Sequence, residues 1–239
     1  MPDLASRPQR EAALATMILA LWREQGGDLA ALGDRANWPR IELEFRSLIV
    51  PQLRDVFIEA AEAMAAVYGV PYNPEHLAAA SAQWAIANAR TVAEQVTATT
   101  RQHVAYAIQK ARSEHAGEEA LILLLLLGMS DVRAEGIAIT TTTGTVSAGE
   151  RWLAAEFNRQ GTGSGASRDG GGPFGGGGTG EQLVPFWHTE QDGLVCNICR
   201  PLHGQPEEVW SIVAPAGPEA HPRCRCWLRW EKRTTAMAA

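Results

Sequence analysis

Two short clusters of metal-binding residue types constrain this 239-residue chain more than any other feature. The first is a Cys-x-x-Cys turn, whose two sulfurs can face one tetrahedral ion at about 2.3 Å. The second follows about two dozen residues later, reads His-x-x-Cys-x-Cys, and supplies ligands from a distant strand or loop. Together the clusters offer five candidate ligands for one ion: Cys196, Cys199, His221, Cys224 and Cys226.

A four-coordinate site needs only four of these five donors. Cys224 and Cys226 are two residues apart, so on an extended strand both side chains fall on the same face. We expect Cys196, Cys199 and Cys226 to be ligands, with either His221 or Cys224 in the fourth place. A closed, sulfur-rich set indicates a structural Zn²⁺, because a hydrolytic zinc keeps one position open for water.

The segment that carries these donors is about 50 residues long, too short to bury enough apolar surface to fold unaided. A metal ion would supply the missing stability. Two disulfides, or four unbound thiols, are the alternatives. We expect no signal peptide, and in a reducing compartment neighbouring thiols more often bind metal. Four tryptophans are expected to form a small apolar core around the metal: Trp187, Trp210, Trp227 and Trp230.

Other polar residues near the clusters carry weaker signals. Asp192 is expected either to accept a hydrogen bond from a ligand histidine or to form a surface turn with Gly193. His188 and His203 are expected to be ordinary surface residues. Three more histidines lie in helical sequence that lacks the Glu-x-x-His pairing of helical metal centres: His76, His103 and His115.

The first two-thirds of the chain is predicted to be α-helical, because apolar residues recur at three- and four-residue spacing. The first helix is expected over Pro8–Gln25, ended by Gly26 and Gly27. Asn73, followed by a proline, is a helix-start signal. The Thr140–Thr145 run is β-branched and could either extend or fray a helix. The other helices are predicted over residues 39–68 with a break or kink at Pro51, 73–116, 118–127, 132–139 and 147–158.

The most apolar run of the chain is Leu121–Leu127, LILLLLL. Seven residues are far short of the roughly 20 that span a bilayer. We therefore expect a buried helix turn and no membrane contact. The formal net charge of -6 argues against broad adhesion to nucleic acid, since phosphate binding depends on Lys and Arg.

Residues 161–180 hold almost half of the chain's 23 glycines. Such a stretch loses much backbone entropy on ordering and gains little apolar burial, so a flexible linker is expected. The predicted fold is therefore mainly α. It consists of a helical N-terminal body over residues 1–160, a Gly-rich linker over 161–180, and a small α+β zinc-binding module over 181–239.

The region around the clusters reads W....DGLVCNIC..LHG....HPRCRC, and its ordered residues are Trp187, Asp192, Cys196, Cys199, Leu202, Gly204, His221, Pro222, Cys224, Arg225 and Cys226. This pattern resembles the C-terminal signature of the phage head morphogenesis proteins, also called Mu F-like minor head proteins. The segment Ser130–Gly149 resembles the helical element before that signature, where an Arg-Ala pair and a later Ala-Gly pair recur. The resemblance covers roughly the last 110 residues.

The resemblance implies a minor structural protein of a tailed phage or prophage that acts in head morphogenesis. Its expected location is the virion, in the capsid interior or at the portal vertex, and the host cytoplasm during assembly. The expected partners are the portal protein and other head proteins, with weak, nonspecific contact to packaged DNA. Two features depart from the family: Thr140-Thr141 stands where Thr-Glu is common, and the Gly-rich insertion is unusually long.

On this interpretation the chain is not an enzyme. One alternative is a zinc-stabilised nuclease of the HNH type, which needs a histidine base beside an acidic residue or a second histidine. The sequence has no Asp-His or His-His dipeptide. The other alternative is a nucleic-acid-binding zinc module, since basic residues gather near the end of the chain. Nearby glutamates offset that charge.

Overall fold

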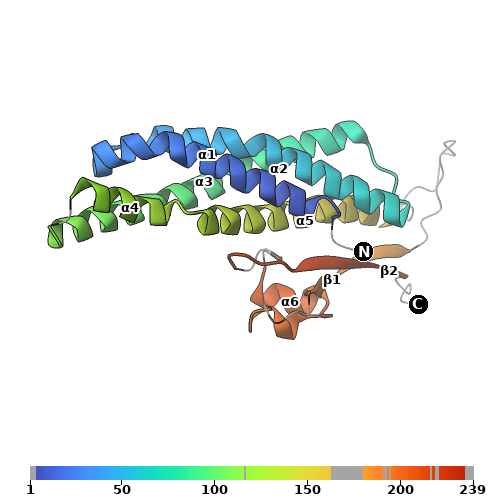
Figure 1. The fold of residues 1–239 in the computed structure, drawn as a ribbon. Coiled ribbons are helices and arrows are strands. Elements are labelled where there is room, and N and C mark those ends of the chain that lie inside the picture. The colour runs from blue at the N-terminus through green and yellow to red at the C-terminus, as the bar shows by residue number, and fades with distance from the viewer. Residues whose placement is uncertain are drawn as a thin grey trace. The chain divides into compact units, whose positions relative to one another are not determined.

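The computed structural model describes residues 4–162 and 180–234, except for Ala116, Gln191, Asp192, Leu194, Ala216, Glu219 and Ala220. Most of the Gly-rich segment, for which a linker was predicted, lies outside the described residues. Within them the chain is mainly helical and carries a small two-stranded sheet near its C-terminus, as predicted (Figure 1). No described helix is both long enough and apolar enough to cross a membrane.

The elements follow the sequence in a simple order. The helices are α1 (Arg7–Leu32), α2 (Trp38–Tyr68), α3 (Pro74–Ser113), α4 (Glu118–Gly128), α5 (Asp131–Thr162) and α6 (Glu207–Val213). Two 3₁₀ turns occupy Gly33–Arg35 and Arg200–Leu202. The strands are β1 (Glu181–His188) and β2 (Trp227–Thr234).

The contacts of the chain group these elements into two compact units. The helical unit contains Ser6–Asp55 and Ala80–Thr142. The mixed unit contains Met1–Ala5, Val56–Ala79 and Thr143–Ala239. Within the mixed unit we call residues 180–234 the C-terminal module.

The core of the helical unit is built from the apolar stripes that the sequence predicts. Leu14, Ile18 and Trp22 are buried on α1 and pack with buried residues of the neighbouring helices, among them Phe45 and Ile49 of α2. Small residues of α3, such as Ala85 and Ala89, are fully buried and let the helices approach closely. Amphipathic helices of this kind gain most of their stability from packing one apolar face.

The predicted end of α1 at Gly26 and Gly27 is wrong, because the helix continues to Leu32. Leu29, one turn beyond the glycines, is almost fully buried and extends the apolar stripe. The chain turns instead at Gly33, whose φ of 53° is a left-handed conformation that glycine adopts without strain. Burial of the next turn therefore outweighs the weak helix preference of the two glycines.

The remaining helix predictions are mostly confirmed. Asn73 caps α3, since its Oδ1 accepts the backbone N–H groups of Glu75 and His76 at 2.8 and 3.2 Å. The α2 helix runs through Pro51, so no break occurs there. The Thr140–Thr145 run is helical, and α5 joins the two helices predicted on either side of it.

The prediction that Leu121–Leu127 forms a buried helix turn is wrong, because only Leu125 of this run is buried. Leu125 is 3% exposed, whereas Leu123 and Leu127 are 64% and 69% exposed. Composition alone cannot decide which side of a uniformly apolar helix is covered. The α4 helix therefore leaves an apolar strip on the surface of the helical unit.

Arg133 in α5 joins α5 to the neighbouring helices of the helical unit. Its guanidinium lies 5.0 Å from the centre of the Trp22 ring. Burial lowers the pKa of Arg133, yet an arginine so perturbed still carries its charge at neutral pH. The guanidinium donates hydrogen bonds to oxygens of α3 and α4: Gly128 O (2.6 Å), Val96 O (3.2 Å), Thr99 Oγ1 (2.7 Å) and Thr100 Oγ1 (2.9 Å).

Gly149 marks a close approach between α2 and α5 within the mixed unit. A Cβ added at Gly149 would overlap the backbone oxygen of Phe57 and press on the Cβ of Ala60. The Gly149→Ala variant is expected to lower the free energy of unfolding of the mixed unit by about 2 kcal/mol, because the helices must separate. Denaturant titration followed by tryptophan fluorescence measures this change.

Gly26→Ala is the matched control for that experiment. Gly26 also lies inside a helix, but a Cβ added there meets nothing within 4 Å. Alanine is the better helix former, so this variant is expected to be as stable as the parent chain or slightly more stable. Equal effects of the two substitutions would show that the α2–α5 approach does not require glycine at position 149.

Candidate metal centre

The two strands of the C-terminal module position the metal-binding segments. β1 and β2 pair antiparallel, from Glu181 opposite Thr234 to His188 opposite Trp227. The β1 strand therefore leads into the first cluster, and the second cluster leads directly into β2. Because paired strand ends lie together, the pairing brings the two clusters to the same end of the sheet.

A small aromatic core lies beside the sheet, as predicted for three of the four tryptophans. Trp187 and Trp210 are fully buried, with ring centres 5.8 Å apart, and Trp230 is 4% exposed. Trp227 is only partly buried and packs against the His188 ring at 5.0 Å. Each of these rings contributes a large apolar surface to the core of a short segment.

Gly204 shapes the turn that follows the first cluster. Its φ of 75° is in the left-handed region, which favours glycine. Its N–H donates to the Trp187 carbonyl oxygen at 2.7 Å, and the Trp187 N–H donates to the Gln205 carbonyl oxygen at 2.9 Å. This exchange ties the turn to β1, and the Gln205 N–H donates to the carbonyl oxygen of buried Leu202 at 2.9 Å.

The module is also joined to the helices of the mixed unit by buried polar contacts. Thr143 of α5 is 1% exposed and donates its hydroxyl to the Cys224 carbonyl oxygen at 2.8 Å. The Trp230 indole N–H donates to the carboxylate of Glu150 at 3.1 Å. Tyr68 of α2 donates its hydroxyl to the Trp230 carbonyl oxygen at 2.5 Å. Buried polar groups that are paired in this way fix the position of the module on these helices.

Asn158 of α5 adds a two-sided contact with β1. Its Oδ1 accepts the Leu183 N–H at 2.8 Å, and its Nδ2 donates to the Leu183 carbonyl oxygen at 3.2 Å. The side chain thus replaces a neighbouring strand at this point of the sheet.

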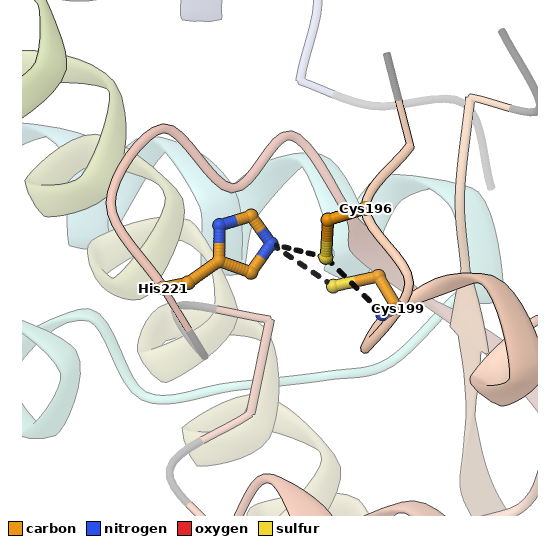
Figure 2. Close-up of side chains that lie close together, drawn as sticks. All are labelled: Cys196, Cys199 and His221. Atoms are coloured by element: carbon orange, nitrogen blue, oxygen red, sulfur yellow. Dashed lines mark hydrogen bonds between the residues drawn. The ribbon is translucent and has the colours of Figure 1, made fainter. Parts of the chain in front are cut away.

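Cys196, Cys199 and His221 meet at one point (Figure 2). The His221 Nε2 lies 3.1 Å from the Cys196 sulfur and 3.2 Å from the Cys199 sulfur. The Cys199 backbone N–H donates to the Cys196 sulfur at 3.3 Å, which stabilises negative charge on that sulfur. Three donors of soft or imidazole type so close together could hold a metal ion.

The His221 ring is oriented as a metal ligand requires. Its Nδ1 lies 2.9 Å from the Pro222 carbonyl oxygen, which can only accept a hydrogen bond. Nδ1 must therefore carry the proton, and in the neutral ring the lone pair is on Nε2. That lone pair faces the two sulfurs, and the carbonyl contact is of the kind that fixes the tautomer of ligand histidines.

A second group is made of Cys199, Cys224 and Cys226. Cys199 thus belongs to both groups, and its sulfur lies 3.9 Å from that of Cys224. Hydrogen bonds from Cys199 and Cys226 hold the pKa of the Cys224 thiol well below its usual value. The hydrogen bond to Cys224, together with burial, raises the pKa of Cys199. All five predicted donors therefore lie in two groups that share one sulfur.

The four cysteines are free thiols in this structure. The separation of 3.9 Å between the Cys199 and Cys224 sulfurs is far longer than the roughly 2.05 Å of a disulfide. Cys199, Cys224 and Cys226 are buried, whereas Cys196 and His221 are half-buried. The centre is thus closed on one side and reaches the surface of the module on the other.

The prediction for His188 and His203 as ordinary surface residues is wrong. Their ring centres lie 4.4 Å apart, and both residues are half-buried. Thr189 donates its backbone N–H to the His203 Nδ1 at 3.1 Å. Burial lowers the pKa of His188, and the neighbouring His203 and Arg229 lower it further. Asp192, predicted either to support a ligand or to form a surface turn, lies outside the described residues.

A comparison of the chain with protein-family models, curated proteins and solved structures finds no match. The likeness to the phage head morphogenesis proteins rests on the sequence pattern around the two metal-binding clusters.

Proposed function

We propose that the C-terminal module is folded around one structural Zn²⁺ ion, held by Cys196, Cys199, His221 and Cys224. The observation that carries this proposal is a pair of overlapping donor groups that share Cys199 and draw on two segments more than twenty residues apart. Sulfur-rich tetrahedral sets of this kind favour zinc. A full set of four protein ligands leaves no position for a reacting water.

Distances favour Cys224 over Cys226 as the fourth ligand. With zinc–sulfur bonds of about 2.3 Å, two sulfurs of a tetrahedron lie about 3.8 Å apart. The Cys199 and Cys224 sulfurs are 3.9 Å apart, close to that value. His221 contacts the Cys196 and Cys199 sulfurs at 3.1 and 3.2 Å, slightly closer than in a tetrahedral site. Cys224 and Cys226, of which the sequence favoured the latter, both belong to the group without His221, so the Cys199–Cys224 separation is what favours Cys224.

This assignment is tested by a pair of substitutions. Cys226→Ser is expected to keep one zinc per chain, because it removes no proposed ligand. His221→Ala is expected to weaken zinc affinity by more than about 100-fold, since loss of a residue that merely supports a ligand already costs 10- to 100-fold. Competition with a chromogenic chelator measures both affinities. If Cys226→Ser loses its zinc while His221→Ala keeps it, Cys226 is the ligand instead.

We further propose that the chain is a structural minor head protein of a tailed phage or prophage, acting in head morphogenesis at or near the portal. The support is the motif that resembles that family. Several of its residues serve one compact module: Trp187 lies in the core, Gly204 forms the tight turn, and the Cys and His residues form the metal groups. Long amphipathic helices joined to a rigid module also suit an assembly protein.

The assembly proposal is tested by co-expression with the portal protein of the same phage genome. The expected result is a complex that survives size-exclusion chromatography and contains one zinc per copy of this chain. Cys226→Ser is the matched control and is expected to bind the portal as the parent chain does. A folded, zinc-loaded chain that never binds portal or other head proteins would refute the head assignment and leave the metal assignment intact.

Contacts of β2 weaken the proposal of a nucleic-acid-binding module. Arg229 and Arg233 lie 3.4 and 3.7 Å from the carboxylate of Glu231. Arg233 also covers the Phe186 ring at 4.6 Å, and Lys232 covers the Phe157 ring at 5.4 Å. Cations engaged within the chain contribute little to phosphate binding, so weak contact with packaged DNA is all that we propose.

The pairing of His188 with His203 favours the nuclease alternative to a limited degree, because it supplies the second histidine that the sequence lacks as a dipeptide. The contact from Thr189 to the His203 Nδ1 gives that ring a structural role as well. A plasmid-nicking assay with Mg²⁺ or Mn²⁺ tests whether this histidine pair is catalytic or only structural. No cleavage is expected from the zinc-loaded protein. Cleavage that disappears in the His188→Ala variant would establish the nuclease.

A further inference from the structure

An apolar strip runs along the exposed side of α4 in the helical unit. It consists of Ile122, Leu123, Leu126 and Leu127, which are 40%, 64%, 52% and 69% exposed. Spacings of three and four residues place Leu126 beside Ile122 and Leu123, and Leu127 beside Leu123, on the helix surface. A contiguous exposed strip of large aliphatic residues is typical of an interaction site.

A groove of about 630 Å³ lies beside this strip, between α1 and α4. Ile122 and Leu126 belong both to the strip and to the wall of the groove, so the two features form one surface. The opposite wall carries Trp22 and the glycines Gly26 and Gly27 of α1. Apolar walls of this kind suit the ridge of another helix.

The glycine pair keeps the α1 backbone open to close approach from outside. A Cβ added at either Gly26 or Gly27 would meet nothing within 4 Å, so packing inside the chain does not require glycine there. Glycine nevertheless destabilises a helix interior relative to alanine. Small residues at such places let a second helix pack closely against the backbone.

Two opposite charges line the same groove, Arg23 from α1 and Asp131 at the start of α5. Both side chains are exposed, and neither forms an ion pair with another described residue. In a two-fold symmetric pair the same patch is used by both partners, so the surface must complement itself. A rim with one cation and one anion meets this condition, since each Arg23 can face the other copy's Asp131.

We propose that this surface binds a second copy of the chain, as a two-fold dimer in which the α4 strip of each copy lies in the α1–α4 groove of the other. Leu123 and Leu127 form the inserted ridge, Gly26 and Gly27 the floor that receives it, and Arg23 pairs with Asp131 across the interface. The proposal depends on neither the metal ion nor the phage assignment.

The test is sedimentation velocity of the full-length, zinc-loaded chain from low to high micromolar concentration. The parent chain is expected to dimerise within this range. The double variant Leu123→Glu, Leu127→Glu is expected to weaken dimerisation by about tenfold or more, because it places charge in an apolar interface. The control is Ile212→Glu, at an 82% exposed apolar position of the mixed unit, and it is expected to dimerise normally.

Charge reversal distinguishes a second copy from any other occupant. Arg23→Asp and Asp131→Arg are each expected to weaken the dimer, because each places like charges opposite one another. The chain that carries both reversals is expected to regain the parent affinity. A parent chain that stays monomeric at every concentration would overturn the proposal, even if a foreign protein were found to bind the groove. A dimer indifferent to the glutamate variants would overturn it too.

Discussion

Replacement of Cys199 by serine is expected to release the metal ion and to unfold the C-terminal module. Cys199 is 1% exposed and is the donor shared by both groups of the centre. Metal binding contributes on the order of 10 kcal/mol to small zinc modules, which is comparable to the whole stability of a domain, about 5–15 kcal/mol.

The readouts for Cys199→Ser are zinc content and tryptophan packing. The near-ultraviolet circular dichroism from Trp187 and Trp210 is expected to collapse, because these buried rings lie in the module. The far-ultraviolet signal is expected to keep most of its helical character, since the helical unit has its own core. Cys226→Ser controls for loss of a thiol, and exhaustive chelation of the parent chain should reproduce the variant. A metal-free module that keeps its tryptophan signal would show that the module does not need zinc to stay folded.

Arg133→Ala is expected to have the second largest effect, lowering the free energy of unfolding of the helical unit by about 3 kcal/mol. The variant removes four charge-assisted hydrogen bonds that tie α5 to α3 and α4, and the contact with the Trp22 ring. It also leaves a cavity and acceptors without their donor. Hydrogen exchange of the α3 amides, together with denaturant titration, measures the loss.

Arg101→Ala is the control for Arg133→Ala. Arg101 also lies over a tryptophan, with 5.9 Å to the Trp38 ring, but its side chain is exposed. Exposed contacts of this type contribute little, so near-parent stability is expected. Arg133→Lys should lie between the two, because lysine keeps the charge but cannot reach several acceptors at once. Equal stability of the Arg133→Ala and Arg101→Ala variants would refute this stabilising role of Arg133.

The helices could be predicted from the sequence because their apolar periodicity and caps are local signals. Leu14, Ile18 and Trp22 are buried as their spacing indicates, and Asn73 caps α3. The end of the first helix was predicted wrongly at Gly26 and Gly27, because a glycine pair ends a helix only when the next turn has no apolar residue to bury. The burial of the α4 leucines was predicted wrongly, because the sequence of a helix that is apolar on all sides does not indicate which side faces the core.

The metal-binding residues could be predicted because ligand chemistry restricts which residue types recur at short spacing. Their grouping could not, since it depends on turns and strand ends rather than on residue types. The supports of the module were missed as well. Thr143, Glu150 and Asn158 are polar residues of a helix, which normally indicates a solvent-facing side. The burial of Thr143 and Glu150 and the contact of Asn158 with β1 follow only from the tertiary structure. The His188–His203 pair likewise joins residues fifteen positions apart.

The two-sided contact between Asn158 and Leu183 fixes both ends of the stretch that separates them. Residues 158 and 183 are therefore neighbours in space whatever the length of chain between them. An epitope tag or a reporter domain placed between them in the sequence need not separate α5 from β1.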